Sequence, residues 1–230
     1  MNLRQGRVLR IGHRGAAALA PENTLESIQA AIDHGVDLVE IDVVEERGRL
    51  RLAHDASSLT RASPSLEEAL ELLALRGTGV LLDLKSKGVE GSAVSLLRAR
   101  GLVDRSVVAS FHAESLRAVK EIDSTVTTGF SYPFDRAGLS RRAAFQPLIR
   151  GGLAGMRRVL PARIGRMLTR TRADAAVLHW ELVSPVLVQR CHARGAAVLA
   201  WTVEDETALA RALGAGVDGV IANDPRLLGE

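Results

Sequence analysis

The sequence predicts an α/β protein built as a single (β/α)8 (TIM) barrel. Short β-branched or apolar runs alternate with segments of helical periodicity along most of the 230 residues. Eight such runs occur, which is the number of strands that closes this kind of barrel. The first run ends in Gly12-His13-Arg14-Gly15, which is not the glycine pattern of a dinucleotide-binding open sheet. A closed barrel is therefore favoured over a doubly wound sheet.

Each element has its own local signal, and we expect one domain over residues 1–230. Asn23 or Thr24 can cap the first helix, and Ser65 with Glu68 has the spacing of a capping box before the second. Strands are predicted at residues 8–12, 38–44, 80–85, 107–110, 126–131, 176–179, 198–202 and 219–222. Helices are predicted between them at residues 24–34, 66–75, 93–99, 113–121, 185–193 and 206–213.

The composition excludes several classes of protein. With 47% hydrophobic and 25% charged residues, the chain is neither disordered nor of low complexity. Its one cysteine, Cys191, offers neither an intrachain disulfide nor a cysteine-rich zinc cluster. No signal peptide is visible at the start, and no apolar stretch is long enough to span a bilayer. We therefore expect a cytoplasmic protein.

The net charge of +3 conceals a strong asymmetry. Residues 136–172 contain ten arginines and no acidic residue, so the rest of the chain carries 20 basic against 27 acidic residues. This balance argues against a nucleic-acid-binding protein and for one local anionic contact.

The arginine-rich segment, read as a helical insertion after the fifth strand, has two interpretations. It can supply the ordinary fifth barrel helix, which we favour for part of its length, because a barrel needs that cover. It can also be a basic amphipathic helix that contacts an anionic membrane peripherally, at the inner membrane face. Pro161 is expected to kink or split it. One helical stripe is formed by Ile149, Leu153, Met156, Leu160, Ile164 and Met167.

Carboxylates lie at the ends of the second and third predicted strands, where barrel enzymes place their active sites. Glu40 and Asp42 are two residues apart, so both point to one face of a strand, and Asp83 and Lys85 repeat that spacing. Three converging carboxylates need a cation between them, and oxygen ligands suit Mg²⁺ or Ca²⁺. The alternative is an internal ion network in which they pair with Arg14 and Lys85. From the residues alone, both stay open.

Two histidines are candidates for proton transfer. His13 and His54 each follow a predicted strand beside a charged residue, and only imidazole titrates near neutral pH without help. His112 and His179 stay ambiguous. Trp201 either stacks on a substrate or fills the barrel, and we favour the pocket in a chain with only 3% aromatic residues.

Taken together, these motifs resemble the glycerophosphodiester phosphodiesterases, whose barrel is like that of phosphatidylinositol phospholipase C. The resemblance covers nearly the whole chain. Its motifs are IGHRG (11–15), PENT (21–24), VEID (39–42), HD (54–55), PSLEEAL (64–70), LLDLK (81–85), SF (110–111), WTV (201–203) and GVDGVIAND (216–224).

The resemblance implies a metal-dependent phosphoric diester hydrolase that releases an alcohol and sn-glycerol 3-phosphate. It also implies a general acid–base pair, His13 and His54. The implied phosphate contacts are Arg14 and Lys85; the substrate contact of Trp201 is the interpretation given above and does not come from the resemblance. The implied ligands of one divalent cation, Mg²⁺ or Ca²⁺, are Glu40, Asp42 and Asp83.

Two departures from the family pattern keep other functions open. Asp83 stands where many relatives have Glu, which puts the identity of the metal in doubt. The small inserted cap subdomain of the family is expected to be missing, because only residues 56–63 separate HD from PSLEEAL. An uncapped site favours the alternative of a lysophospholipase D that acts on lysophospholipids at a membrane surface. A second alternative is an inactive barrel that binds phospholipid.

Overall fold

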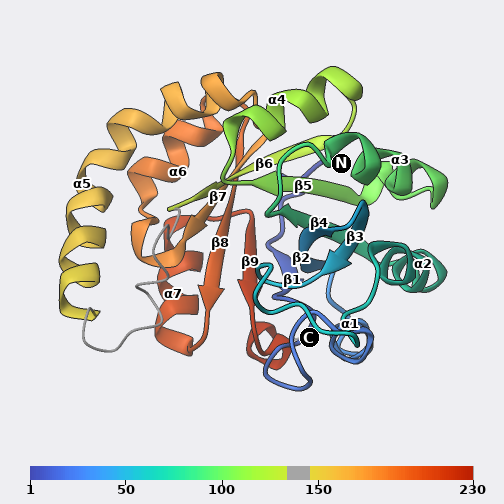
Figure 1. The fold of residues 1–230 in the computed structure, drawn as a ribbon. Helices are drawn as coiled ribbons and strands as arrows, with labels where there is room; N and C mark the ends of the chain where they lie inside the picture. Colours follow the sequence, from blue (N-terminus) through green and yellow to red (C-terminus); the bar gives the residue numbers. More distant parts are fainter. Residues whose placement is uncertain (134–145, 230) are drawn as a thin grey trace.

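The protein is a closed barrel of eight parallel strands in a computed structural model that describes residues 1–133 and 146–229 (Figure 1). Neighbouring strands follow the order β1-β9-β8-β7-β6-β5-β4-β2, and pairing of β1 with β2 closes the ring. The predicted fold class is confirmed. The barrel strands are β1 (Leu9–Gly12), β2 (Leu38–Glu46), β4 (Gly79–Leu84), β5 (Ser106–Ser110), β6 (Thr127–Tyr132), β7 (Ala175–His179), β8 (Ala197–Val203) and β9 (Gly219–Ala222).

Helices surround the strands, as Figure 1 shows. The six helices predicted between strands all form, and their ends fall within three residues of the prediction. The α-helices are α1 (Leu25–Asp33), α2 (Leu66–Arg76), α3 (Glu90–Ala99), α4 (Ala113–Ile122), α5 (Gln146–Thr171), α6 (Pro185–His192) and α7 (Glu206–Ala215). Short 3-10 turns are η1 (Val103–Arg105), η4 (Trp180–Leu182) and η5 (Pro225–Leu228).

One strand was not predicted. β3 (Arg49–Leu52) runs antiparallel to the end of β2 and lies outside the closed ring. Its exposed arginine at 49 alternates with buried Leu50 and Leu52, but four residues are too few for this period to stand out in the sequence. From β3 the chain runs through residues 53–65 directly to α2.

The described part of the arginine-rich segment forms α5, on the outside of the barrel. Leu153, Leu160 and Ile164 are buried as expected, but Leu168 is buried in place of Met167, because the stripe continues at a spacing of four. The helix is not split at Pro161. The first part of the segment, residues 136–145, lies outside the described residues. Within the described chain, no helix combines the length and apolarity needed to cross a bilayer.

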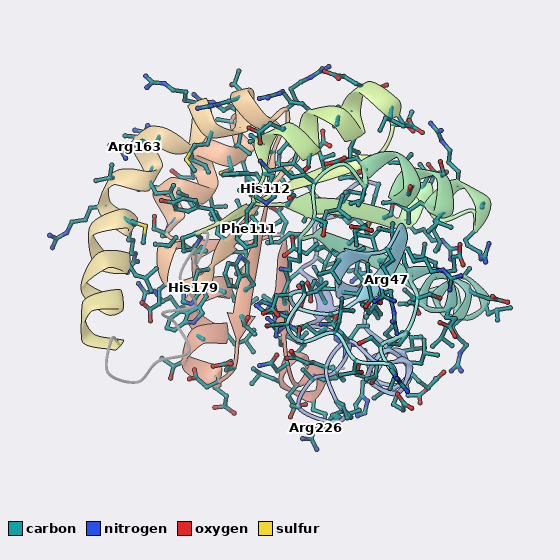
Figure 2. The ribbon with its side chains drawn as sticks, in the orientation of Figure 1. Arg47, Phe111, His112, Arg163, His179 and Arg226 are labelled. Carbon is teal, nitrogen blue, oxygen red and sulfur yellow. The ribbon has the colours of Figure 1, made fainter. Side chains whose placement is uncertain are left out.

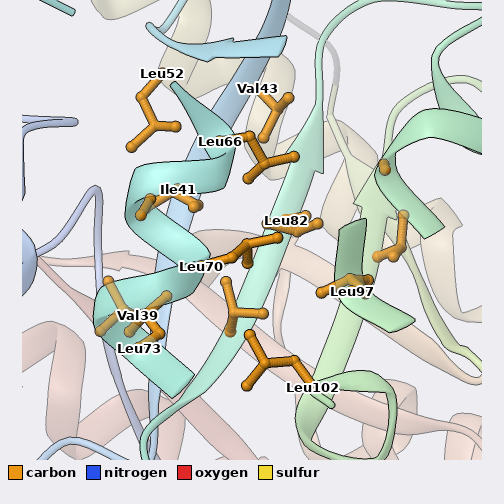
Figure 3. Close-up of a cluster of buried hydrophobic side chains, with 14 of the residues drawn as sticks. Val39, Ile41, Val43, Leu52, Leu66, Leu70, Leu73, Leu82, Leu97 and Leu102 are labelled. Carbon is orange, nitrogen blue, oxygen red and sulfur yellow. The ribbon is translucent and has the colours of Figure 1, made fainter. Parts of the chain in front are cut away.

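Alternating side chains of the strands face either the core inside the barrel or one of two clusters packed against the helices outside it. On β2, Leu38 packs inside the barrel, whereas Val39 and Ile41 pack outward against the helices. Figure 3 shows Leu70 and Leu73 of α2 among this outer cluster. The same alternation holds on the other barrel strands except β6, which contributes no residue to the inner apolar core. The residues that face inward are Leu9 and Ile11 on β1, Leu81 on β4, Val107 and Ala109 on β5, Ala175 and Val177 on β7, Ala197 and Leu199 on β8, and Ile221 on β9.

The turn after β1 is too tight for side chains at either glycine. A Cβ at Gly12 would lie 2.5 Å from the carbonyl oxygen of Gly15. Gly15 itself has φ +87°, and a Cβ there would lie 2.3 Å from the hydroxyl of Ser27. These two glycines let α1 approach β1 closely, and this packing fixes His13 and Arg14 between them.

We predict that Gly15→Ala destabilises the protein by roughly 2–5 kcal/mol, the sum of left-handed strain and overpacking. Gly48→Ala is the matched control, since Gly48 has φ +80° but nothing within 4 Å of its added Cβ. The control should lose only about 1–2 kcal/mol. Urea unfolding of the two variants measures both values, and equal losses would contradict the close packing of Gly15 on Ser27.

Candidate active site

The polar residues of interest continue the inward-facing alternation of each strand at its carboxyl end. Leu38 faces the barrel interior, so Glu40 and Asp42 do as well, and Leu81 likewise leads to Asp83. The register pairs Asp42 with Asp83 on the neighbouring strand. One oxygen from each of these three buried carboxylates lies within 4.8 Å of the others. The predicted acidic trio therefore forms.

Two cations compensate this buried negative charge. The ammonium of Lys85 lies 2.7 Å from Asp42 and also contacts Asp83. The guanidinium of Arg14 lies 3.0 Å from Asp42, and its backbone N–H donates to Glu40 at 2.7 Å. The ion network considered from the sequence is thus present together with the acidic trio, and the two interpretations do not exclude each other.

Burial and neighbouring charges shift the pKa values of Glu40 and Asp42 in opposite directions. Burial, together with the neighbouring charge of Asp42, raises the pKa of Glu40 well above its ordinary value. Burial also opposes ionisation of Asp42, but Lys85, the hydrogen bond with His54, and Arg14 hold its pKa well below the ordinary value. The surroundings therefore favour the ionised form of Asp42 and oppose ionisation of Glu40.

The trio fits a hard divalent cation. All three donors are carboxylate oxygens, the ligand type that Mg²⁺ and Ca²⁺ prefer. The Oδ1 atom of Asp83 is buried and has no hydrogen-bond partner, although buried polar atoms are normally satisfied. A cation at this position would satisfy that oxygen and would lower the cost of ionising Glu40.

Both candidate histidines reach the trio. The Nε2 atom of His13 lies 3.9 Å from Glu40, and its Nδ1 is hydrogen-bonded to Asn223 at 2.6 Å. His54, which follows β3, places Nδ1 at 3.3 Å from Asp42. Burial and the charge of Arg14 lower the pKa of His13 to about 4. The two rings therefore contact different carboxylates of the same trio.

Aromatic residues border the same end of the barrel on the strands β5, β7 and β8. The rings of Phe111 and His179 meet Trp201 edge to face, with centroids 6.4 and 5.4 Å apart. The Trp201 indole donates to the carbonyl of Val177 at 3.0 Å, so its polar atom is satisfied and its faces supply apolar contact. Lys85 lies 5.3 Å from the centroid of Phe111, which connects this side to the acidic trio. Figure 2 shows Phe111 and His179 toward the middle of the fold.

Several residues that shape the site had no predicted role. Thr24 is the helix cap, so the side chain of Asn23 is free to bind Asp42. Its Nδ2 donates to the Asp42 carboxylate and its Oδ1 accepts from the Asp42 backbone N–H, each at 3.0 Å. Glu22 holds Arg14 at 2.7 Å. Asn223, one inward step beyond Ile221, could have been found from the alternation. Glu22 and Asn23 belong to the PENT motif (21–24), but their contacts depend on the conformation of a loop, which the spacing along the strands does not predict.

A large groove in the described part of the chain lies elsewhere. It measures about 1700 Å³ and is lined by the tip of the β2–β3 hairpin together with parts of α2 and α3. It contains none of the carboxylates or histidines above, so its size is no guide to the chemistry.

Comparison with known proteins places this arrangement in context. The model of the glycerophosphoryl diester phosphodiesterase family matches residues 13–72 and 84–227. The chain is 25% identical to a glycerophosphodiester phosphodiesterase of Caldanaerobacter subterraneus subsp. tengcongensis, over 96% of both proteins. It is also 25% identical to a glycerophosphodiester phosphodiesterase of Arabidopsis thaliana, over 94% of this chain and 70% of that protein.

Solved structures share the fold. A phosphodiesterase of Oleispira antarctica, in complex with its product sn-glycerol-3-phosphate, superposes with a TM-score of 0.71 at 23% identity, over 94% of this chain and 93% of that one. A glycerophosphodiester phosphodiesterase of Parabacteroides distasonis gives a TM-score of 0.74 at 16% identity, over 96% and 95%.

We predict that His179 makes stability depend on pH. Burial lowers its pKa from 6.5 to about 4, so between these values the unfolded chain binds a proton that the folded chain does not. Stability is therefore lost as the pH falls below 6.5, by about 2 kcal/mol between pH 7 and pH 5. Urea unfolding of His179→Gln at both pH values should show a loss smaller by this amount than in the unmodified protein. Equal losses in the two proteins would contradict the shifted pKa.

Proposed function

Because the chain belongs to the glycerophosphoryl diester phosphodiesterase family, and so is a phosphoric diester hydrolase, we propose that it hydrolyses glycerophosphodiesters to an alcohol and sn-glycerol 3-phosphate. The observation that carries this proposal is the convergence of two histidines on one buried acidic trio. A phosphodiester requires a site that neutralises its charge, orients the nucleophile and protonates the leaving group. The residues that meet these requirements lie on β2 and β4 or follow β1, β3 and β4.

Charge neutralisation is assigned to Arg14 and Lys85, with the cation. Both side chains are 16% exposed and reach Asp42 from different strands, so a phosphate at the open end of the barrel meets two fixed donors. Glu40, Asp42 and Asp83 would hold one divalent cation, Mg²⁺ or Ca²⁺. When bound, such an ion supplies Lewis-acid stabilisation of phosphoryl oxygen charge.

Proton transfer is assigned to His13 and His54. The 2-hydroxyl of the substrate's glycerol attacks phosphorus and gives its proton to one imidazole, while the other imidazole protonates the departing alcohol. A new phosphorus–oxygen bond forms as the bond to the alcohol breaks, which leaves a cyclic phosphate. Water then opens this ring with the two histidine roles exchanged.

A lysophospholipid is the second candidate substrate. The structure has no subdomain between β3 and α2, so nothing inserted there covers this side of the site. Trp201, with Phe111 and His179, supplies an apolar border that suits an acyl chain or a glycerol backbone. The third possibility, a barrel that binds phospholipid without turnover, is disfavoured because a complete histidine pair faces a complete acidic trio.

The proposed location is the cytoplasm, with peripheral contact at an anionic membrane through α5. On its outer face Arg158, Arg163, Arg166 and Arg170 are exposed, and none of them forms an ion pair with any described residue. Val159 is 44% exposed among them. Figure 2 shows Arg163 on the outside of the molecule. Unpaired arginines around exposed apolar surface are typical of helices that lie on anionic lipid.

We predict that His13→Ala and His54→Ala each lower kcat for glycerophosphocholine by about 10²–10⁴-fold, the usual contribution of general acid–base catalysis. EDTA should abolish turnover, and added Mg²⁺ or Ca²⁺ should restore it. ³¹P NMR of the reaction measures product formation, and its application to lysophosphatidylcholine separates the two substrate classes.

The matched control for these variants is His34→Ala, which removes an exposed imidazole at the end of α1. Its kcat should stay within about twofold of the unmodified protein, since surface substitutions rarely disturb the rest of a fold. Unchanged turnover in His54→Ala would refute the catalytic assignment. Binding of lysophospholipid with no hydrolysis of any substrate would instead support the inactive barrel.

We predict that the protein floats with phosphatidylglycerol vesicles and not with phosphatidylcholine vesicles. Removing three charges by Arg163→Gln, Arg166→Gln and Arg170→Gln should weaken this binding roughly 100-fold, at about 1 kcal/mol for each arginine. The control carries the same charge change on the opposite side of the molecule, around the β2–β3 hairpin that Arg47 marks in Figure 2. Its substitutions are Arg47→Gln, Arg49→Gln and Arg61→Gln, all at exposed positions. Equal recovery of both triple variants would rule out docking through α5.

A further inference from the structure

A row of three polar residues crosses the carboxyl ends of three neighbouring strands. Glu204 follows β8, Asn223 follows β9, and His13 follows β1. The Asn223 side chain hydrogen-bonds both of the others, with Nδ2 donating to Glu204 Oε1 at 3.1 Å and Oδ1 lying 2.6 Å from His13 Nδ1. The chain of contacts therefore runs from an exposed carboxylate to an imidazole that is only 14% exposed.

The strand register explains why these three residues meet. Ala222 of β9 pairs with Gly12 of β1, which sets the next residues, Asn223 and His13, side by side. The backbone N–H of His13 donates to the carbonyl of Ala222 at 2.8 Å and holds this pairing past the end of β1. The two side chains then point to the barrel interior together.

On the other side, a bulge in β8 selects the partner of Asn223. Ala200 pairs with Val220, but Val203 pairs with Ala222, so β8 contains one extra residue over this stretch. Without the bulge, Val203 would stand opposite Asn223. With it, Val203 packs into the outer core and Glu204 takes the position opposite Asn223. The irregular strand thus presents a carboxylate where a regular strand would present an apolar side chain.

The polarity of this row is set at its Glu204 end. An ionised carboxylate only accepts hydrogen bonds, so the Asn223 amide nitrogen must face Glu204 and the Asn223 oxygen must face His13. That oxygen also only accepts, so His13 Nδ1 must carry the hydrogen. Nε2, which lies 3.9 Å from Glu40, is then the ring nitrogen that exchanges a proton.

We infer that Glu204 is a positioning residue, which acts through Asn223 to hold His13 in the tautomer with hydrogen on Nδ1 and an open Nε2. Glu204 does not touch the reacting atoms. The catalytic part of this inference rests on the proposed function, because it matters to turnover only if His13 transfers protons. The tautomer itself can be observed without turnover.

The test combines histidine-labelled ¹⁵N NMR with kinetics on glycerophosphocholine. At alkaline pH, where imidazole is neutral, the spectrum distinguishes the protonated ring nitrogen of His13 from the unprotonated one, and His13→Gln assigns the signals. The unmodified protein should show hydrogen on Nδ1. Glu204→Gln should give a mixture of tautomers and lower kcat about tenfold with KM unchanged, in the range typical of groups that orient a functional histidine.

Two further variants test whether the effect of Glu204→Gln comes from the direction of the hydrogen bonds. The first controls for the loss of one negative charge, and the second restores the hydrogen-bond acceptor at His13. Glu206→Gln removes the same charge two residues later on exposed surface, and it should change neither the tautomer nor kcat. The second variant adds Asn223→Asp to Glu204→Gln. The new amide at position 204 then donates to the new carboxylate at position 223, and that carboxylate again only accepts a hydrogen bond from His13. This double variant should recover the Nδ1 tautomer and most of kcat.

The outcomes are distinct for the two claims. Hydrogen on Nε2 in the unmodified protein, or an unchanged tautomer in Glu204→Gln, would overturn the positioning role even if the enzyme is active. A tautomer that responds as expected in a protein that hydrolyses no glycerophosphodiester would leave the positioning of His13 standing and would refute the proposed function.

Discussion

The charge on Asp42 is the constraint on which the rest of the site depends. This carboxylate is almost completely buried, which is tolerable only with compensation. Arg14 and Asn23 come to it from the connection between β1 and α1, Lys85 comes from the end of β4, and His54 comes from the end of β3. Three parts of the chain that are distant in sequence are therefore fixed relative to one another by the need to satisfy one ionised group.

The barrel supplies the geometry through a single rule of alternation. Every ring strand except β6 contributes apolar residues to the interior, and the first inward position beyond that core is polar or aromatic on most strands. His13, Asp83, Phe111, His179 and Asn223 all occupy such positions. The apolar core inside the barrel and the groups at its open end thus occupy successive inward positions of the same strands. A change in the packing of that core would therefore also move the site residues on these strands.

The parts of the protein that follow this alternation could be predicted from sequence, and the others could not. The acidic trio and the helix boundaries were predictable because each rests on spacing within one segment. β3 was missed because it is too short to show a period, and the bulge in β8 because its extra residue is defined only by the pairing with β9. The choice of Thr24 over Asn23 as helix cap was open, because both residue types satisfy a helix end equally well.

The position of His54 has an architectural consequence. The other groups described at the acidic trio stand on the closed ring or on a connection that follows directly from one of its strands, whereas His54 is delivered by a hairpin that projects outside the ring. The connection that follows this hairpin joins β3 to α2 and forms none of the strand pairs that close the ring, so its length can change while the eight strands stay paired. Segments that recognise further parts of a substrate can therefore be inserted between β3 and α2, beside the acidic trio, without changing the strands of the barrel.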